Sequence, residues 1–508
     1  MRVNPVKYGA VMSYVSYALG MVLNLIATPL MLRSFGENEY GVYQLVMPLT
    51  SMLTVLTFGL GSVYTRYYSI YKTQQDTVRM GRLNGMFIAM YSVIGAVAMV
   101  IGTVLALFFE QLFPDVSPSM IPLGRTLTVI MTLNMAVSFP IYVFTSHIIV
   151  NEAYIYQKTV AALKMVINPI LTIVLMLLGF RSIAASVLML VLTLAVGVAD
   201  IVYCFKKLRM PVEWGMPEKG VLKEMMGFTL FVFISNLVDE VNWNSDRIVL
   251  GAFGGAQSEV MVGAYALGAQ INIYFMSLAT MLTNVFVPRA HRLIAGGRPD
   301  KEVSDLFIKV GRWQFILLSF ILVGFIAVGR GFMAFYSGGE YDATTVYVLA
   351  LMLMIPTMVP SIQNLGIEIQ QAKNKHRFRA ITYAIVAVVN VALSIPLCIY
   401  YGAIGAALGT TFTVVIGKGV LMNWYYHKHI GLDIGRFWKE IGRIALPMCV
   451  PLAAAIGMAL YADTTNPVVF FLCGGGIVAM EAVAMWFFGM KPEDRDQIAG
   501  PLLRRLKK

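Results

Sequence analysis

The sequence predicts an all-α polytopic membrane protein of about fourteen transmembrane helices: two six-helix bundles related by a pseudo-twofold axis, plus two extra C-terminal helices. Three observations predict this fold. Hydrophobic residues make up 58% of the 508 residues and charged residues only 13%, against roughly 25% charged residues in soluble domains. Apolar stretches of about 20 residues, long enough to cross a bilayer, fill most of the chain. The first twelve stretches form two sets of six with similar spacing.

Windows of about 20 apolar residues place the spans in order. The first six lie at 9–32, 42–65, 86–109, 124–146, 159–178 and 183–205. The second six lie at 226–250, 263–287, 310–329, 344–367, 380–401 and 403–426, and the last two at 441–462 and 467–489. The predicted domains are an N-terminal bundle at 1–210, a cytoplasmic linker at 211–225, a C-terminal bundle at 226–430, helices 13 and 14 at 431–490, and a basic cytoplasmic tail at 491–508.

An internal repeat relates the two sets of six spans. Adding about 220 to the start of each span in the first set gives the approximate start of its counterpart. The segment from Phe35 to Tyr43 is echoed by the segment from Phe253 to Tyr265, and a second echo begins at Asn168 and Asn390. The alternative explanation is helix packing alone, because small residues after a tight turn let adjacent helices approach closely. With an even number of spans per copy, we expect two bundles of equal orientation around a central cavity.

The positions of Lys and Arg predict the orientation. If the amino terminus is cytoplasmic, five of the 39 basic residues lie on the outer side and two lie inside spans. The outer five are Arg33, Arg125, Arg181, Arg247 and Arg330. The remaining 32 lie on the inner side, so the positive-inside rule places both termini in the cytoplasm. Because the net charge of +12 faces anionic lipid head groups, we expect membrane lipids and no nucleic acid as partners.

Motifs for catalysis or metal binding are absent from the sequence. The four Cys residues are scattered, and His427 and His429 lie at a span end. Gly417-Lys418 lacks both the first Gly and the hydroxyl residue of a P-loop. We therefore expect no enzyme activity, no ATPase, no metal site and no cofactor.

Polar side chains form stripes on one face of several spans, where hydrocarbon would be a costly neighbour. These stripes predict contacts with a hydrated cavity, and interhelical hydrogen bonds are the alternative. The residues that we expect to face a hydroxyl-rich ligand are Asn24, Thr54, Asn242, Gln270, Asn284 and Asn364.

Acidic residues inside spans are rare because they cost a few kcal/mol to insert, and they typically mark an ion or substrate path. The seventh span contains three, Asp239, Glu240 and Asp246, and Glu368 directly follows the tenth span. We expect these four residues to couple transport to H⁺ or Na⁺. An internal ion pair of Glu240 with a cation is the alternative.

Basic residues near the cytoplasmic half of the spans predict a phosphate site made of Arg66, Lys164 and Lys418. For the two lysines, snorkelling to lipid head groups is the alternative. Asp200 lies a few residues before Lys206, and we expect it to form a surface pair there. Glu481, in the last span, has no predicted role.

Two segments carry a family resemblance. They are Thr28–Tyr43, continued by Phe58–Ser62 and Arg66-Tyr67, and Asp246–Gly251, continued by Val262–Tyr265. With these segments the chain resembles bacterial polysaccharide flippases of the Wzx type, within the multidrug/oligosaccharidyl-lipid/polysaccharide (MOP) exporter superfamily. The resemblance covers essentially the whole chain. Two departures are the lack of an acidic residue in the first span and of the Arg-rich first span of lipid II flippases.

The resemblance implies a MATE/MOP-like fold in the bacterial cytoplasmic (inner) membrane that moves undecaprenyl-diphosphate-linked oligosaccharide from the inner to the outer leaflet by alternating access. An H⁺ or Na⁺ gradient would drive it. The three basic residues would then bind the diphosphate, and the polar stripes would face the sugar. Polysaccharide polymerase machinery is the expected protein partner, and we expect a monomer. The rival interpretations are a MATE-type drug/cation antiporter, with an acidic cavity, and a membrane glycosyltransferase, which needs a metal-binding carboxylate pair.

Overall fold

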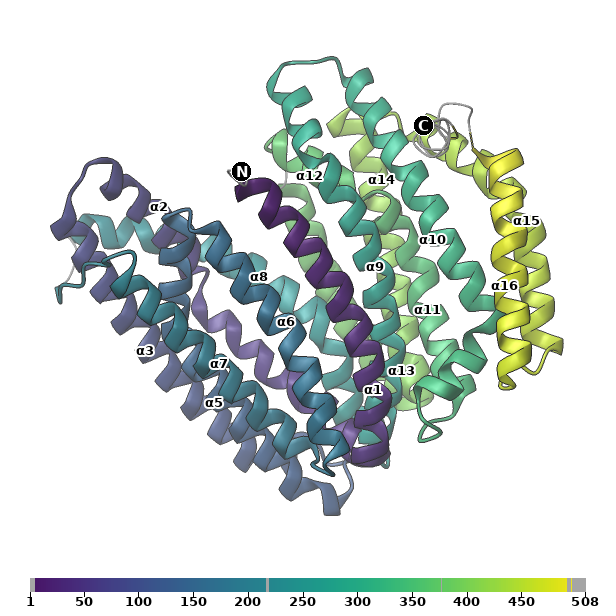
Figure 1. Ribbon diagram of the computed structural model, residues 1–508, viewed down its shortest axis with the longest axis horizontal. Helices are drawn as coiled ribbons and strands as arrows, with labels where there is room; N and C mark the ends of the chain where they lie inside the picture. Colours follow the sequence, from purple (N-terminus) through teal and green to yellow (C-terminus); the bar gives the residue numbers. More distant parts are fainter. Residues whose placement is uncertain (1–4, 216–218, 376, 491–494, 496–508) are drawn as a thin grey trace, which may run out of the picture. The chain divides into compact units, whose positions relative to one another are not determined.

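The structure is a computed structural model that describes residues 5–215, 219–375, 377–490 and 495 (Figure 1). Every regular element within these residues is a helix, and none of them forms a strand. The helices divide into two compact units, the described parts of Met1–Gly263 with Val391–Ala406 and of Ala264–Asn390 with Ala407–Lys508. The predicted domain boundaries and the axis relating the bundles stay predictions.

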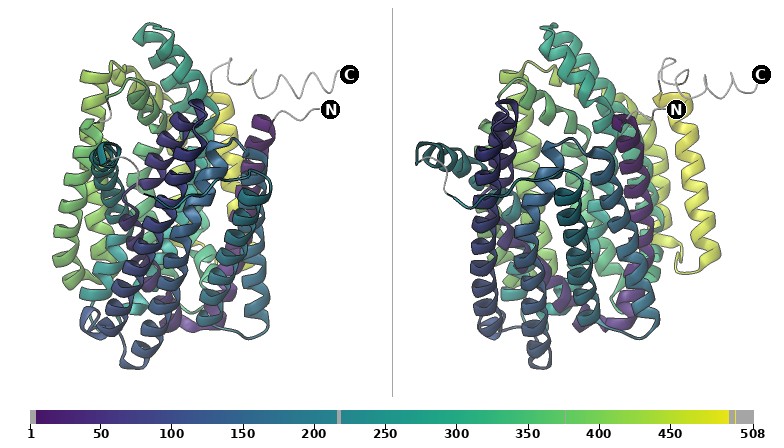
Figure 2. Two further views of the ribbon diagram at one scale, coloured as in Figure 1. Left: turned by 90° about the vertical axis from the view of Figure 1, so that its left-hand side faces the viewer. Right: turned by 60° about the vertical axis from the view of Figure 1, so that its left-hand side comes forward.

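The first unit is built from the N-terminal helices. Its elements are α1 (Pro5–Ser51), η1 (Met52–Thr57), α2 (Leu60–Thr73), α3 (Thr77–Leu107), α4 (Phe109–Leu112), η2 (Pro118–Met120), α5 (Ile121–Val150), α6 (Tyr154–Leu177), α7 (Ser182–Lys206) and α8 (Lys219–Phe253). In this unit α5 packs between α3 and α7, α1 packs on α6, and α8 contacts α1 and η1 (Figures 1 and 2). Gly95 lets α3 approach α5 closely, because a Cβ there would lie 2.6 Å from the Ala136 oxygen.

The second unit contains the remaining helices. Its elements are α9 (Ser258–Ala295), which begins in the first unit, α10 (Asp300–Tyr336), α11 (Ala343–Ile362), α12 (Asn364–Ala372), α13 (Arg377–Thr413), part of which belongs to the first unit, η3 (Val414–Leu421), α14 (Met422–Tyr425), η4 (Tyr426–Ile430), α15 (Ile434–Tyr461), α16 (Pro467–Ala484) and η5 (Met485–Gly489). Here α10 packs against α11, α15 and α16, so the two C-terminal helices are an integral part of the unit. The π-helices η3, η4 and η5 extend α13, α14 and α16.

The predicted spans reappear as helices long and apolar enough to cross a membrane. Eleven such segments occur among the described residues. Two of them, Val15–Thr73 and Arg377–Ile430, each hold two predicted spans, so the eleven account for thirteen of the fourteen. The remaining predicted span, 226–250, lies within α8. The all-α polytopic fold is therefore confirmed.

Two of the predicted connections between spans are kinks, each inside a long helix. Gly36, with φ 74°, separates the first two spans within α1, and Gly402, with φ 54°, separates the eleventh and twelfth within α13. The accompanying ψ values, 169° at Gly36 and −132° at Gly402, lie outside the left-handed helical region that other residues can adopt, so these kinks need glycine. The second predicted span is also interrupted, because η1 is a 3₁₀ helix and Phe58 and Gly59 are left-handed.

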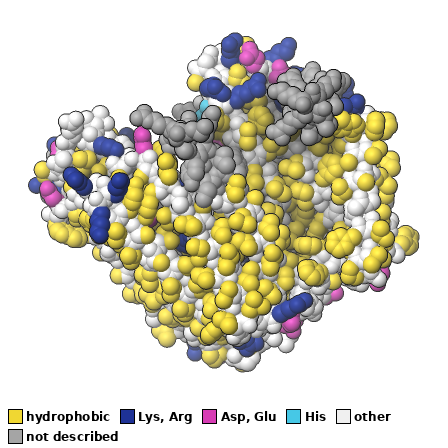
Figure 3. Space-filling model, in the orientation of Figure 1, with side chains coloured by type: hydrophobic (Ala, Val, Ile, Leu, Met, Phe, Trp, Pro, Cys, Tyr) yellow, Lys and Arg dark blue, Asp and Glu magenta, His cyan; other side chains and the backbone are white. Residues whose placement is uncertain are grey.

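The outer faces of the helices suit lipid. On α3 the exposed residues Val93, Val97, Val100 and Val104 form one stripe, with Val93 63% and Val100 65% exposed. Exposing such an apolar stripe to water would be unfavourable, whereas contact with the hydrocarbon of a bilayer is not. On the face shown in Figure 3, hydrophobic side chains cover the middle of the helices, and Lys and Arg gather at their ends.

Carboxylate caps fix where several helices begin. Asp76 accepts a hydrogen bond from the Arg79 amide at 2.9 Å, and Asp342 accepts one from the Thr345 amide at 2.7 Å. At the start of α11, the hydrogen bonds from the Thr345 hydroxyl and amide hold the pKa of Asp342 below its ordinary value. The cap thus stabilises α11 while the carboxyl is ionised.

Candidate functional site

The interrupted second span lies against α8, and a polar cluster joins them. Three side chains donate hydrogen bonds to the Glu240 carboxylate: Ser51 at 3.4 Å, Thr54 at 3.1 Å and Asn244 at 2.6 Å. Ser51 ends α1, and Thr54 belongs to the 3₁₀ segment η1. The contact therefore brings together a residue predicted to couple ions, Glu240, and one predicted to face sugar, Thr54.

The cluster continues along α8 to a cation. Arg247 donates to the Asn244 Oδ1 at 3.4 Å and to the Gln44 Oε1 at 3.4 Å. Asn244 thus bridges the acid Glu240 and the base Arg247 on one helix. We call these six residues the Glu240 network: Gln44, Ser51, Thr54, Glu240, Asn244 and Arg247.

The network supplies hydrogen-bond donors to an acidic group that would be costly inside a membrane span without them. Glu240 is half-buried and Asn244 is buried, so the carboxylate needs hydrogen-bond donors in place of water. Non-helical backbone within a membrane is tolerated only where protein covers it or where it lines a water-filled cavity. Broken helices beside polar side chains are typical of substrate and ion sites in transporters. This arrangement can bind a cation, a proton or a hydroxyl-rich ligand.

The other three predicted ion-coupling residues have separate surroundings. Asp239 is exposed on α8, whereas Asp246 is buried there. Glu368 lies in the second unit, where its carboxylate is 3.8 Å from the Nε2 of His291. Their coupling role stays a prediction.

The predicted sugar-facing residues divide between local and interhelical hydrogen bonds. Asn24 and Asn242 donate to the backbone oxygens four residues earlier, of Gly20 and Val238. In the second unit, Asn364 donates to the Thr280 hydroxyl at 3.0 Å and so joins α12 to α9. Gln270 is half-buried and Asn284 is exposed.

The predicted phosphate-binding cations lie on different helices. Arg66 is exposed on α2, with its guanidinium 5.9 Å from the centre of the Tyr67 ring. Lys164 is exposed on α6 and donates to the Thr193 hydroxyl of α7 at 3.5 Å. Lys418 belongs to the second unit, within the π-helix η3, and its ammonium is 5.3 Å from the centre of the Tyr383 ring.

The prediction that Asp200 forms a surface pair is wrong. Asp200 is 5% exposed and accepts hydrogen bonds from Thr145 at 2.9 Å and from Tyr156 at 3.1 Å. Its position inside the predicted span 183–205 could have signalled this burial. The nearness of Lys206 in the sequence did not indicate a pair, because Lys206 lies at the end of α7, six residues after Asp200.

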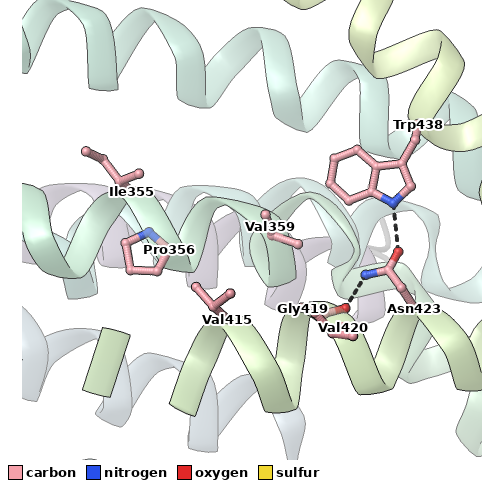
Figure 4. A pocket seen from close by; sticks show the side chains of 8 residues that line it. All are labelled: Ile355, Pro356, Val359, Val415, Gly419, Val420, Asn423 and Trp438. Atoms are coloured by element: carbon pink, nitrogen blue, oxygen red, sulfur yellow. Dashed lines mark hydrogen bonds between the residues drawn. The ribbon is translucent and has the colours of Figure 1, made fainter. Parts of the chain in front are cut away.

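An apolar cavity in the second unit is a separate feature (Figure 4). It measures about 520 Å³ and is lined by Ile355, Pro356, Val359, Val415, Gly419, Val420, Asn423 and Trp438. The Trp438 indole donates to the Asn423 Oδ1 at 2.9 Å, so the polar atoms at one end bind each other. With an otherwise apolar lining, this cavity is poorly suited to a sugar or a phosphate.

Among the residues whose placement the structure describes, no three His, Cys, Asp or Glu side chains gather as metal ligands would. We take the Glu240 network as the candidate functional site because its polar side chains meet beside a broken helix.

Comparison with known proteins gives a family and a fold. The family described as "Polysaccharide biosynthesis protein" matches residues 6–294, more than half of the chain. Comparison with curated proteins finds no match.

Solved structures with a similar fold are membrane transporters. The lipid II flippase MurJ, in an inward closed conformation, has a TM-score of 0.71 at 14% identity, covering 94% of this chain and 98% of its own. A multidrug resistance MATE family transporter of the MOP superfamily, facing inward, has a TM-score of 0.62 at 15% identity, covering 83% of this chain and 96% of its own. A MOP superfamily transporter from Pyrococcus furiosus has a TM-score of 0.54 at 14% identity, covering 85% and 97%. These similarities confirm the predicted MATE/MOP-like fold.

Proposed function

The chain belongs to the polysaccharide biosynthesis protein family, and from that premise we propose that it is a flippase of the MOP superfamily for undecaprenyl-diphosphate-linked oligosaccharide. The substrate would move from the inner to the outer leaflet of the bacterial cytoplasmic membrane, with both termini of the protein in the cytoplasm. Ion-coupled alternating access would drive the movement. Polysaccharide polymerase machinery would receive the product on the outer side.

One observation carries the proposal: a carboxylate, two hydroxyls and an amide meet where a transmembrane helix is broken. Glu240 receives Thr54 and Ser51 from one chain segment and Asn244 from its own helix. A flippase needs such a polar place for the sugar, because each hydroxyl group that lost its hydrogen bonds in hydrocarbon would cost about 2–7 kcal/mol. Hydroxyl and amide groups can replace water around a sugar at much lower cost.

The share of the chain that matches is larger for the flippase than for the drug transporter. The MurJ structure covers 94% of the chain, and the MATE structure covers 83%. Similarity at 14% identity supports only the fold, so the substrate remains the proposal.

We assign roles to the predicted residues as follows. Arg66, Lys164 and Lys418 attract the diphosphate, and the prenyl chain stays in lipid. The sugar-facing residues and the Glu240 network bind the oligosaccharide and the coupling ion. Protonation of Glu240, or binding of Na⁺ to it, would weaken the hydrogen bonds from Ser51 and Thr54 that hold η1 against α8. Ion binding would therefore change the conformation of the site.

Depletion in the native bacterium tests the proposal. Loss of the protein should make lipid-linked oligosaccharide accumulate on the inner leaflet, and wild-type protein should restore export. Glu240→Gln should fail to restore export. Glu110→Gln is the matched control, because Glu110 forms an exposed pair with Arg125 at 3.1 Å outside the network. Normal export after depletion would refute the proposal.

The MATE-type antiporter is the remaining alternative, since MATE structures share the fold. It predicts drug sensitivity on depletion, with no change in lipid-linked oligosaccharide. Measuring both quantities in the same depleted cells separates the two functions.

A further inference from the structure

A buried carboxyl group lies in the last helix, outside the Glu240 network. Glu481 of α16 is 0% exposed, and neither of its oxygens has a hydrogen-bond partner among the described residues. Buried carboxylates are normally paired or hydrogen-bonded, so a carboxyl group without either requires an explanation. An ionised carboxylate without a partner would be very costly there.

The neighbour of Glu481 determines which form of the carboxyl group fits. Ser319 of α10 lies beside it. The Ser319 hydroxyl donates its hydrogen to the Ile316 backbone oxygen at 2.8 Å and therefore presents lone pairs. While that bond is in place, a carboxylate would meet lone pairs at Ser319, whereas a protonated carboxyl can donate to the Ser319 oxygen and leave the bond to Ile316 intact.

No cation is placed to replace that proton. The elements packed against α16 are α10, α15 and η5. Charged groups of α10 and α15 pair with one another: the buried Arg312 is 3.9 Å from the buried Glu440, and the exposed Arg443 is 3.1 Å from the same carboxylate. The other ionisable groups on these elements are Cys473 on α16, Cys449 and Tyr461 on α15, Tyr336 on α10, and the charges toward the ends of α10 and α15, Asp300, Lys301, Glu302, Asp305, Lys309, Arg330, Arg436 and Lys439; η5 has none. No described group of these elements forms an ion pair with Glu481.

We propose that Glu481 is a proton-binding site, in which α16 holds a protonated carboxyl against Ser319 of α10. The site is separate from the Glu240 network. Its ligand is H⁺, because the described residues place one hydroxyl oxygen beside the carboxyl group, whereas a metal cation such as Na⁺ needs several oxygen ligands.

A weak turn of α16 gives the proton a route. Gly474, Gly475 and Gly476 precede Glu481 by five to seven residues. A Cβ at Gly475 or Gly476 would meet nothing within 4 Å, and one at Gly474 would make an ordinary contact with Val328, so packing does not require glycine. Each Gly weakens a helix by about 1 kcal/mol relative to Ala. Opening at this turn lets the carboxyl group exchange its proton.

Carbodiimide labelling tests the proton site without measuring transport. Apolar carbodiimides react with protonated carboxyl groups in membranes, so peptide mass spectrometry of the protein in lipid nanodiscs should find the label on Glu481. Glu440 is the internal control, because two arginines pair with its carboxylate. Infrared spectra should show a protonated-carboxyl band that Glu481→Gln removes. An unlabelled Glu481, together with no loss of that band, would overturn the proposal.

Two further arms test the route and the connection to transport. Gly475→Ala with Gly476→Ala should slow labelling by at least tenfold, since two substitutions of about 1 kcal/mol each exceed the 1.4 kcal/mol that equals a factor of ten. An unchanged rate would overturn the route. The connection to transport rests on the proposed function: Glu481→Gln should abolish the proton dependence of flipping. If Glu481 is labelled but wild-type protein does not flip the substrate, the proposed function fails and the proton site stands. If flipping by the variant keeps its proton dependence, the coupling role fails.

Discussion

Glu240 is the residue whose substitution tests the site most sharply. Replacement by Ala removes the acceptor of three hydrogen bonds, but not all three donors are then left without an acceptor. The Ser51 hydroxyl also bonds the Pro48 oxygen at 3.0 Å, and the Thr54 hydroxyl also bonds the Ser51 oxygen at 2.7 Å. Both hydroxyls therefore stay satisfied when Glu240 is removed.

The Asn244 amide bears most of the loss. Its hydrogen bond to Glu240 is short, at 2.6 Å, and Asn244 is buried. A buried donor left without its acceptor costs about 1–3 kcal/mol, so Glu240→Ala should lower the free energy of unfolding by about 2 kcal/mol. Glu240→Gln keeps an oxygen that can accept from Asn244, so its loss should stay below about 1 kcal/mol.

The two variants separate stability from transport. Denaturant unfolding in lipid nanodiscs measures the first quantity, and flipping of lipid-linked oligosaccharide measures the second. We expect Glu240→Gln to fold almost as stably as the wild type, yet to flip at least tenfold more slowly, because the charge is lost. Wild-type flipping by Glu240→Gln with unchanged ion dependence would refute a coupling role. An equal destabilisation by Gln and Ala would refute the hydrogen-bond argument.

Three other substitutions test the fold. Gly41→Ala should cost about 3 kcal/mol or more in unfolding free energy, because its Cβ would lie 1.8 Å from a backbone oxygen of α9, whereas Gly442→Ala, with open space around it, should be tolerated. Asp342→Ala should cost about 1 kcal/mol as a lost helix cap. Because the pKa of this carboxyl is lowered in the fold, the effect should be full at neutral pH, decline as pH falls below about 4, where the unfolded chain takes up the proton, and vanish only below the lowered pKa of the folded state. Arg312→Met should cost about 3 kcal/mol, the low end for breaking a buried pair, because a second arginine still pairs with Glu440. Denaturant unfolding measures all three effects.

The spans were predictable because the bilayer imposes one strong rule, a run of about 20 apolar residues. The same rule could not predict the break at η1. The sequence from Met52 to Thr57 is as apolar as that of an unbroken transmembrane helix, so only tertiary packing selects the 3₁₀ form. The kink at Gly36 was within reach, since Gly is the residue that adopts φ 74° at little cost.

Polar residues were easier to find than to pair. Glu240 and Thr54 were recognisable as costly groups inside spans, but the sequence does not place them 3.1 Å apart. Asn244 and Gln44 were missed because amides at these positions give no distinct signal of their own. Asp200 was misassigned because neighbours in sequence were preferred to Thr145 and Tyr156, which come from other helices.

Reconstituted transport tests the central claim most directly. Purified protein is placed in liposomes with a fluorescent undecaprenyl-diphosphate oligosaccharide, and a membrane-impermeant quencher reports which leaflet holds the sugar. The account predicts that wild-type protein moves the substrate between leaflets much faster than protein-free liposomes do and that Glu240→Gln does so at least tenfold more slowly than wild type. Substrate movement at the protein-free rate in the presence of folded wild-type protein, with an imposed ion gradient, would contradict it.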